Sequence, residues 1–290
     1  LPGGHAVTLV VTTVIFGAIS GSGIAAIAAI GMLLVPSMVE KGYPRAFAIA
    51  LSAASAQIGV LIPPSIPLIL FGELTETSVV GLFAAGIIPG LCLAGILILL
   101  SLIMATRGGW PRSRAYTWHE RGGILVKGLP ALFLPVLILG GIYGGIFSPT
   151  EAAVVGCAYA FIFGSISRRL SWGESVKAVV STARITGMIF LLVASTVLFG
   201  KIMIYLMVPQ WITTTIAEAG LTLALFMLCI IGFYLLIGMF AEVIVITLVT
   251  VPILSPVMCA LSVPAYSFAI VMTTAVVIAG ITPPVGVNIF

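Results

Sequence analysis

Two short segments combine paired prolines with glycine and hydroxyl-bearing residues: "GVLIPPSIP", residues 59–67, and "GITPPVG", residues 280–286. Proline has no backbone N–H, and it disfavours helical geometry at the residue before it. A helix that reaches either segment is therefore expected to break there. A broken helix exposes carbonyl oxygens at one C-terminus, which suit a cation such as sodium, and N–H groups at the next N-terminus, which suit a carboxylate.

The composition places these breaks inside a membrane. Hydrophobic residues make up 61% of the 290 residues and charged residues only 7%, whereas a soluble domain has about 25% charged residues. The apolar runs lack the ~10-residue alternation of a membrane β-barrel. The Lys and Arg residues behind the net charge of +4 lie in a few loops, which indicates membrane orientation rather than nucleic-acid binding. We therefore predict an all-α integral membrane protein. Its four cysteines lack metal-ligand spacing and are predicted to be small core residues.

The lengths of the uncharged runs predict the membrane segments. The run Ala6–Val39 is short for two crossings and long for one, so we expect a re-entrant hairpin with its tip at Gly21-Ser22-Gly23. A second hairpin is expected at 221–261. A span broken by a proline pair follows each hairpin, at 44–74 and from Pro264 onward. The other predicted crossings are 79–106, 128–147, 150–167 and 178–206, with a polar loop at 107–127 and a capping box at Ser148–Glu151.

The two proline-containing regions form an internal repeat. When 220 is added to the residue number, four prolines coincide without a gap: Pro36, Pro44, Pro63 and Pro64 fall on Pro256, Pro264, Pro283 and Pro284. Five predicted crossings separate the two hairpins, and an odd number puts their entrances on opposite faces. The base of the first hairpin carries Lys41 and Arg45, whereas the base of the second carries no Lys or Arg. The repeat is therefore predicted to be inverted, as in many secondary transporters.

Eight motifs run through the whole sequence in one order: "LPGGHA", "FGAISGSG", "IPPSIPLILFG", "AGIIPG", "GGIYGGIFSPTEAA", "GMFAE", "PILSPV" and "ITPPVGVNIF". With these motifs the sequence resembles the large membrane subunit of TRAP (tripartite ATP-independent periplasmic) transporters, of the ion transporter superfamily. The resemblance implies an elevator-type, sodium-coupled importer in the bacterial inner membrane. Its substrate would be an organic acid such as a C4-dicarboxylate or sialic acid. Its partners would be a periplasmic substrate-binding protein and a small membrane subunit.

The resemblance also implies the organisation of the chain. Residues 1–75 and 221–290 would form the transport domain, and 76–220 would supply scaffold and connecting helices. Leu1 stands where a complete chain has Met, so the sequence is expected to be a fragment without the family's initial helices and C-terminal end. Gln57 stands where the family pattern implies a smaller residue, and Ala279 where it implies glycine.

The site residues follow from the same resemblance. Sodium ions, the only metal or cofactor expected, would bind at the hairpin tips and helix breaks: Ser20, Gly21, Ser22, Gly59 and Pro63 in the first repeat, and Gly238, Glu242, Gly280, Thr282 and Pro283 in the second. The substrate would bind between them, at Ser22, Gly23, Pro64, Ser65, Pro284 and Asn288.

Each of these signals also has a simpler explanation. Gly17 and Gly21 could serve only close helix packing, and the paired prolines could be kinks. Glu242, the only charged residue after Ala219, could couple ions or merely cap a helix. Ser65 and Asn288 could satisfy freed backbone groups instead of binding substrate.

Three other functions compete with the importer. One is a stand-alone sodium/carboxylate symporter of the same superfamily, another is a channel, and the third is an intramembrane serine hydrolase. The enzyme is disfavoured because the sequence has no Asp, no HExxH motif and no His within the core of a predicted span. We therefore expect a transporter and not an enzyme.

Overall fold

The computed structural model describes residues 3–110, 118–168, 170–218, 220 and 222–283, and all the regular elements within these ranges are helices. Six helical stretches are long and apolar enough to cross a membrane, by length and composition. These findings confirm the predicted all-helical membrane protein. The chain forms two compact units, Leu1–Ser113 with Thr196–Phe290 (unit 1) and Arg114–Ser195 (unit 2), and each is described by itself.

The first hairpin of unit 1 breaks where the sequence predicts. Helix α1 (Gly4–Ser20) ends at Gly21, whose φ of 64° lies in the left-handed region that glycine tolerates. The return arm is continuous from Gly23 to Glu40. It consists of α2 (Gly23–Ala26), a π-helical turn η1 (Ile27–Gly31) and α3 (Met32–Glu40). Gly21 and Ser22 are called the first tip below.

The first proline pair also breaks its helix. Helix α4 (Arg45–Leu61) ends before the pair, and α5 (Ile66–Thr75) begins after it. The non-helical residues Ile62–Ser65 between them are called the first break. Helix α6 (Val79–Arg107) then runs past it, and glycines allow its close approach. A Cβ on Gly86 would stand 2.5 Å from the Leu61 carbonyl oxygen, and one on Gly90 would stand 2.5 Å from Ile62 Cγ1.

The second repeat follows the first at an offset of 220 residues. Helices α11 (Leu223–Ile237) and α12 (Val243–Ala260) form the second hairpin, and α13 (Ala265–Ala279) follows. The bounds of α12 match those of the Gly23–Glu40 arm, and α13 starts at the residue that matches the start of α4. The turns agree as well, because Ser262 adopts the left-handed conformation of its counterpart Gly42, with φ of 54° and 87°.

The hydrogen bonds of these two turns also correspond. The Gly42 N–H donates to Val39 O and the Tyr43 N–H to Met38 O, at 2.9 and 3.1 Å. The matching bonds of the second turn, from Ser262 to Cys259 and from Val263 to Met258, measure 3.2 and 2.9 Å. The internal repeat is therefore present in the backbone and not only in the placement of prolines.

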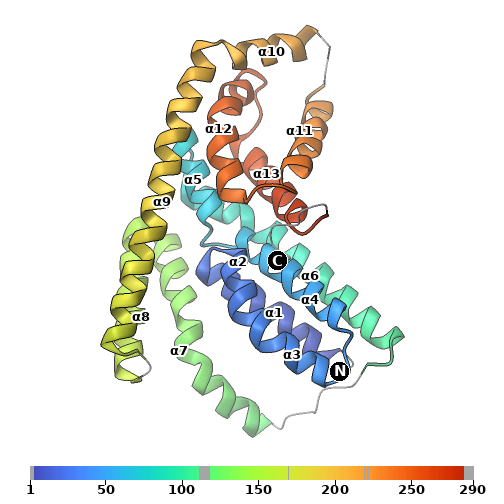
Figure 1. The fold of residues 1–290 in the computed structure, drawn as a ribbon, viewed down its shortest axis with the longest axis vertical. Coiled ribbons are helices and arrows are strands. Elements are labelled where there is room, and N and C mark those ends of the chain that lie inside the picture. The colour runs from blue at the N-terminus through green and yellow to red at the C-terminus, as the bar shows by residue number, and fades with distance from the viewer. Residues whose placement is uncertain (1–2, 111–117, 169, 219, 221, 284–290) are drawn as a thin grey trace. The chain divides into compact units, whose positions relative to one another are not determined.

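The two hairpins of unit 1 run in opposite directions in Figure 1. Helix α1 rises from the N-terminus to the first tip, whereas α11 descends to the tip that joins it to α12. Side chains of both repeats meet in the core, where Phe268 of α13 lies 6.3 Å from Phe71 of α5 and 6.1 Å from Tyr234 of α11 between ring centroids. The arrangement agrees with an inverted repeat, whose orientation in a membrane stays a prediction.

Unit 2 contains α7 (Trp118–Tyr143), α8 (Pro149–Ile166) and the first part of α9 (Trp172–Tyr205). The predicted capping box at the start of α8 is confirmed, since Ser148 N–H donates to Glu151 Oε2 at 2.8 Å and Glu151 N–H to Ser148 Oγ at 3.3 Å. Helices α7 and α8 pack together, and the Tyr159 hydroxyl donates to Pro130 O at 2.8 Å.

Three predictions are wrong in detail. The polar segment 107–127 is not a loop throughout, because α7 already starts at Trp118. Helix α9 starts at Trp172 rather than near 178, where Ser171 and Glu174 form a second capping box that the sequence analysis missed. The four cysteines are exposed in the chain rather than buried in its core. In the first two cases the helix begins in polar residues before its apolar run, in α9 at the capping box.

Helix α10 (Val208–Glu218), which was not predicted, precedes the second hairpin. Within unit 1, the last part of α9 contacts α12. A Cβ on Gly200 of α9 would stand 3.0 Å from the Cβ of Pro252 in α12.

Candidate functional site

The first tip is held by its own serines. The Ser22 N–H donates to Ser20 Oγ at 3.3 Å, and Ser22 Oγ accepts from Ala25 N–H at 3.4 Å, as a helix N-cap does. The Ser22 carbonyl accepts from Ala26 N–H. Within the described residues this leaves the N–H groups of Gly23 and Ile24 without a hydrogen bond. The N-terminus of the return arm thus has two free donors.

Three glycines bring the first tip against the broken helix. A Cβ on Gly17 would stand 2.9 Å from the Cα of Gly59, so α1 and α4 touch backbone to backbone. A Cβ on Gly21 would stand 3.1 Å from Ile66 Cγ1, at the start of α5. A Cβ on Gly23 would overlap the side chain of Gln57 on α4. The first tip therefore lies against α4 and against the start of α5, the two helices on either side of the first break.

The first break supplies carbonyl oxygens and a buried hydroxyl. Its Ile62 is extended, with ψ of 129°, and no capping hydrogen bond closes the end of α4 among the described residues. Ser65 precedes α5 but does not cap it with its side chain. Its hydroxyl is fully buried and finds no hydrogen-bond partner in the part of the chain that the structure describes. The possibility that Ser65 merely bonds to its own backbone is thus wrong for this conformation.

The second tip, Gly238–Glu242, resembles the first. Glu242 stands at the position that matches Ser22 and also caps a helix, since its Oε2 accepts from Ile244 N–H at 3.0 Å. Gly238 closes α11 through a 3.0 Å bond from its N–H to Tyr234 O. A Cβ on Gly238 would stand 2.6 Å from Ala279 Cβ, so this tip rests on the end of α13.

The second break begins at Gly280. The Gly280 N–H donates to Val276 O at 2.9 Å, and Thr282 donates to Ala279 O through its N–H and to Ile278 O through its hydroxyl, both at 2.8 Å. These bonds close the end of α13, unlike that of α4. Pro283 is exposed, whereas Pro284 and Asn288 lie outside the described residues. Of the other predicted residues, Gly238 and Glu242 lie in the second tip, and Gly280, Thr282 and Pro283 follow the end of α13 on which Gly238 rests.

The chemistry available at both sites is that of neutral oxygens, peptide N–H groups and one carboxylate. No cluster of His, Cys, Asp or Glu that could hold a transition metal occurs among the described residues. Peptide carbonyls, hydroxyls and a carboxylate are hard oxygen ligands, which fit sodium. Free N–H groups at a helix N-terminus fit an anion. The site is suited to binding ions rather than to bond chemistry.

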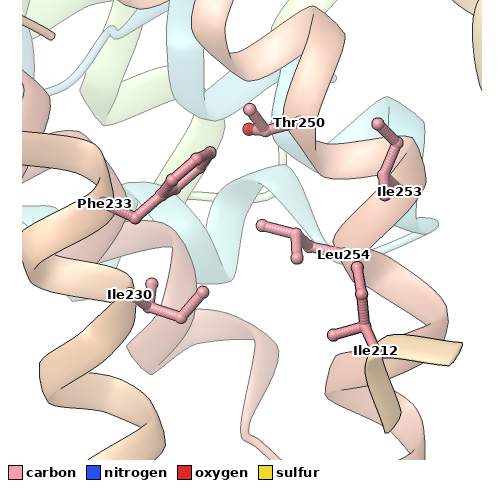
Figure 2. A pocket seen from close by; sticks show the side chains of 6 residues that line it. All are labelled: Ile212, Ile230, Phe233, Thr250, Ile253 and Leu254. Carbon is pink, nitrogen blue, oxygen red and sulfur yellow. The ribbon is translucent and has the colours of Figure 1, made fainter. Parts of the chain in front are cut away.

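An apolar cavity in unit 1 is a separate feature. It encloses about 250 Å³ between α10, α11 and α12 and is lined by Ile212, Ile230, Phe233, Thr250, Ile253 and Leu254. Figure 2 shows these side chains around it. Its one hydroxyl, on Thr250, is already bonded to Tyr234 and to Ile246 O, at 2.9 and 2.8 Å. The cavity therefore offers no ligand for an ion or an organic acid.

The sequence analysis missed two residues that pack at the first tip and the first break. Gln57 was noticed only for its size, yet its amide lies against the tip. Gly86 was noticed only within a motif, yet α6 approaches the Leu61 carbonyl through it. The spacing of Gly86 and Gly90, one helical turn apart, was the available signal for this close approach.

A multi-pass helical protein with two similar halves, in each of which a hairpin tip packs on the helix that follows it, has the architecture expected of a secondary transporter. The comparison with protein families identifies which one. The family model of the tripartite ATP-independent periplasmic transporter, DctM component, matches residues 1–290. The chain belongs to this family and is a multi-pass protein of the bacterial inner membrane.

Several curated proteins are similar over the whole chain. The isethionate TRAP transporter permease protein DctMQ of Oleidesulfovibrio alaskensis is 40% identical over 100% of the chain, which spans 46% of that relative. The C4-dicarboxylate TRAP transporter large permease protein DctM of Pseudomonas aeruginosa is 36% identical over 99% of the chain. The ectoine TRAP transporter large permease protein TeaC of Halomonas elongata is 38% identical over 100% of it. The chain spans 68% of each of these two relatives.

These relatives are named as transporter permeases and not as enzymes, which confirms the prediction that the chain is not an enzyme. The predicted family is confirmed as well.

Proposed function

We propose that the protein is the large permease subunit of a transporter that imports an organic acid across the inner membrane together with sodium. The observation that carries this proposal is that each hairpin tip packs where a helix of its own repeat begins or ends. The contacts are Gly21–Ile66, where α5 resumes after the first break, and Gly238–Ala279, at the end of α13. Unsatisfied peptide groups cost several kcal/mol each in hydrocarbon, so such tips are expected only where they line a cavity or bind a solute.

The proposed sodium sites use the oxygens at these contacts. In the first site the uncapped end of α4 would supply carbonyl oxygens, and the first tip, which packs on Ile66, would supply its serines. In the second site Glu242 would add a negative charge at the tip whose Gly238 packs on the end of α13. A carboxylate that caps a helix has further lone pairs for an ion, so capping and coupling are compatible. The proposed ligands remain Ser20, Gly21, Ser22, Gly59, Pro63, Gly238, Glu242, Gly280, Thr282 and Pro283.

The proposed substrate site lies beside the free N–H groups of the Gly23–Glu40 arm and the buried Ser65 hydroxyl. Pro64 belongs to the same break, and Pro284 and Asn288 would contribute from the second repeat. The acid would be a C4-dicarboxylate, a sialic acid or a similar anion. Among the relatives, the names mention isethionate, C4-dicarboxylates and ectoine.

Transport would proceed by an elevator movement of the hairpins and interrupted helices. The sequence assigned α6 to the scaffold. Gly86 and Gly90 let α6 approach Leu61 and Ile62 closely. The hairpins and the first break would move against this scaffold helix. A periplasmic substrate-binding protein would deliver the substrate, and a small membrane subunit would complete the permease.

Replacing Pro63 and Pro64 together by Ala tests this proposal. The substitution restores two N–H donors and favours a continuous helix across the first break, which removes the exposed carbonyls. In proteoliposomes that contain the full transporter, sodium-driven uptake of the organic acid should fall at least tenfold, while the amount of inserted protein stays unchanged.

The matched control is Pro89→Ala, which changes a proline inside the continuous helix α6 and is expected to preserve uptake. Wild-type uptake by the Pro63/Pro64 double variant would contradict the site. Uptake by the wild type that neither saturates nor depends on a sodium gradient would instead indicate a channel.

A further inference from the structure

Gln57 places a polar side chain under the first tip. The residue lies on α4, two positions before Gly59, and only 3% of it is exposed. A Cβ on Gly23 would stand 2.5 Å from Gln57 Nε2, 2.9 Å from its Cδ and 3.0 Å from its Oε1. The whole amide group therefore occupies the space that the missing side chain of Gly23 leaves.

Packing alone does not account for an amide at this position. A buried amide costs free energy unless its nitrogen and oxygen find polar partners. Gln57 is 3% exposed and makes no hydrogen bond to another described residue, and its amide atoms are not among the fully buried unpaired ones, so the amide has donor and acceptor capacity left for a solute. The second repeat fills the matching positions with apolar residues, since Gly23 corresponds to Val243 and Gln57 to Val277, and both valines are buried. The fold thus tolerates hydrocarbon here, and the first repeat differs from the second by a polar group.

Hydrogen-bonding groups at the start of the return arm and in the first break also lack partners among the described residues. The N–H groups of Gly23 and Ile24 are free among the described residues, at the N-terminus of an 18-residue helical arm. The buried Ser65 hydroxyl, also without a partner, belongs to the break whose next residue, Ile66, touches the first tip. Peptide N–H groups, a side-chain amide and a hydroxyl can all donate to one oxyanion.

We propose that the Gln57 amide is a ligand of the transported solute and donates a hydrogen bond from Nε2 to an anionic oxygen held at Gly23. The inference rests on the proposed function and adds a residue and a substrate class to it. The solute would carry a carboxylate or sulfonate, because a group with several acceptor oxygens can bond to the amide and to the helix N-terminus at once. The inference also makes Gln57 a determinant of specificity.

Uptake kinetics of the complete transporter in proteoliposomes test this role. Succinate, isethionate and ectoine serve as the solutes, and uptake is measured against solute and sodium concentration. Gln57→Met keeps the length of the side chain but removes both hydrogen-bonding groups. For the acid that the wild type accepts, KM should rise at least tenfold, which corresponds to about 1.4 kcal/mol of binding. The maximal rate and the sodium concentration for half-activation should stay within twofold.

Two further variants separate ligation from packing. Val277→Met makes the matching change in the second repeat and should leave KM for the acid unchanged. Gln57→Glu keeps the shape but replaces the donor by a negative charge, so KM should rise further than in Gln57→Met. If the Gln57→Met variant does not insert into the membrane, the KM of the Gln57→Glu variant decides the question. If neither variant inserts, the amide serves folding and the proposal is wrong.

The remaining outcomes also decide the question. An unchanged KM in Gln57→Met would overturn the proposal, and so would a change confined to sodium activation, which would make Gln57 an ion ligand. If the wild type takes up none of the solutes with sodium, the proposed function fails and this inference fails with it. A failure of the proposed function can be told apart from a failure of the Gln57 inference, because it appears in the wild type before any substitution is made.

Discussion

At the scale of single residues, glycine decides how closely the helices of the first repeat approach. Gly17 and Gly59 face each other so tightly that a Cβ on Gly59 would stand 2.7 Å from the Cα of Gly17. Because the atoms that an added Cβ would meet belong to the backbone of the other helix, no side chain can rotate away to relieve the overlap. The contact fixes the end of α4 beside the first tip. The simpler explanation of Gly17, close packing, is therefore confirmed, and it serves the proposed site.

Gly59→Ala should therefore destabilise the protein. Overpacking costs roughly 1–3 kcal/mol, which exceeds the gain of up to about 1 kcal/mol from replacing glycine in a helix. The measurement is the thermal unfolding midpoint of the purified protein in detergent. Gly95→Ala in α6 is the control, because a Cβ there meets nothing within 4 Å, and it should leave the midpoint unchanged or raise it. Equal effects of the two substitutions would refute the close contact.

At the scale of the elements, the two repeats solve the same packing problem with different residues. In the first repeat glycine stands on both helices, at Gly17 and Gly59. In the second, Ala279 replaces Gly59 on the broken helix, and Gly238 supplies the space from the hairpin side. The contact at Gly238 therefore explains why Ala279, where the family pattern implied glycine, still allows the tip to rest on α13.

A double substitution tests this compensation. Gly238→Ala alone should lower the thermal midpoint, because its Cβ would stand 2.6 Å from Ala279 Cβ and overpacking costs roughly 1–3 kcal/mol. Adding Ala279→Gly removes the obstructing methyl group and should recover part of that loss. The two effects should be non-additive, as expected for residues in contact. Additive losses in the double variant would mean that the two residues do not oppose each other.

At the scale of the whole molecule, the orientation of the two repeats is the central prediction. The hairpins run in opposite directions within unit 1 (Figure 1), and only the base of the first carries Lys and Arg. An importer built on an inverted repeat needs the two bases on opposite faces of the membrane. The turns at Gly42 and Ser262, which match in backbone conformation, mark these bases.

Cysteine labelling from each face measures the orientation. Lys41→Cys and Ser262→Cys are introduced separately into a background without the four native cysteines, which must be replaced because they are exposed. A membrane-impermeant maleimide added to intact spheroplasts should label Ser262→Cys and leave Lys41→Cys unlabelled. Inverted vesicles should give the opposite result. Labelling of both positions from the same face would show that the repeat is not inverted.

The sequence by itself determined the class of the protein, the interruption between α4 and α5, and the repeat. These features are encoded locally: apolar runs specify helices in a membrane, and a proline pair or a Gly-Ser-Gly segment interrupts a helix wherever the chain folds. The start of α12 at Val243 and the turn at Ser262 follow from the same offset of 220 residues that aligns the prolines. The starts of α7 and α9 were misplaced because both helices begin in polar residues before their apolar segments, in α9 at a capping box.

Only the tertiary structure decided which groups meet. Gln57 and Gly23 are 34 positions apart, and nothing in their local sequence relates them. The same holds for Gly86 and Leu61, or for the choice between Gly238 and residue 279 as the smaller partner. Such contacts depend on how two helices cross, which is set by the sum of many side-chain volumes along both. The sequence does not show how two helices cross, so only the tertiary structure reveals which distant residues meet at the site.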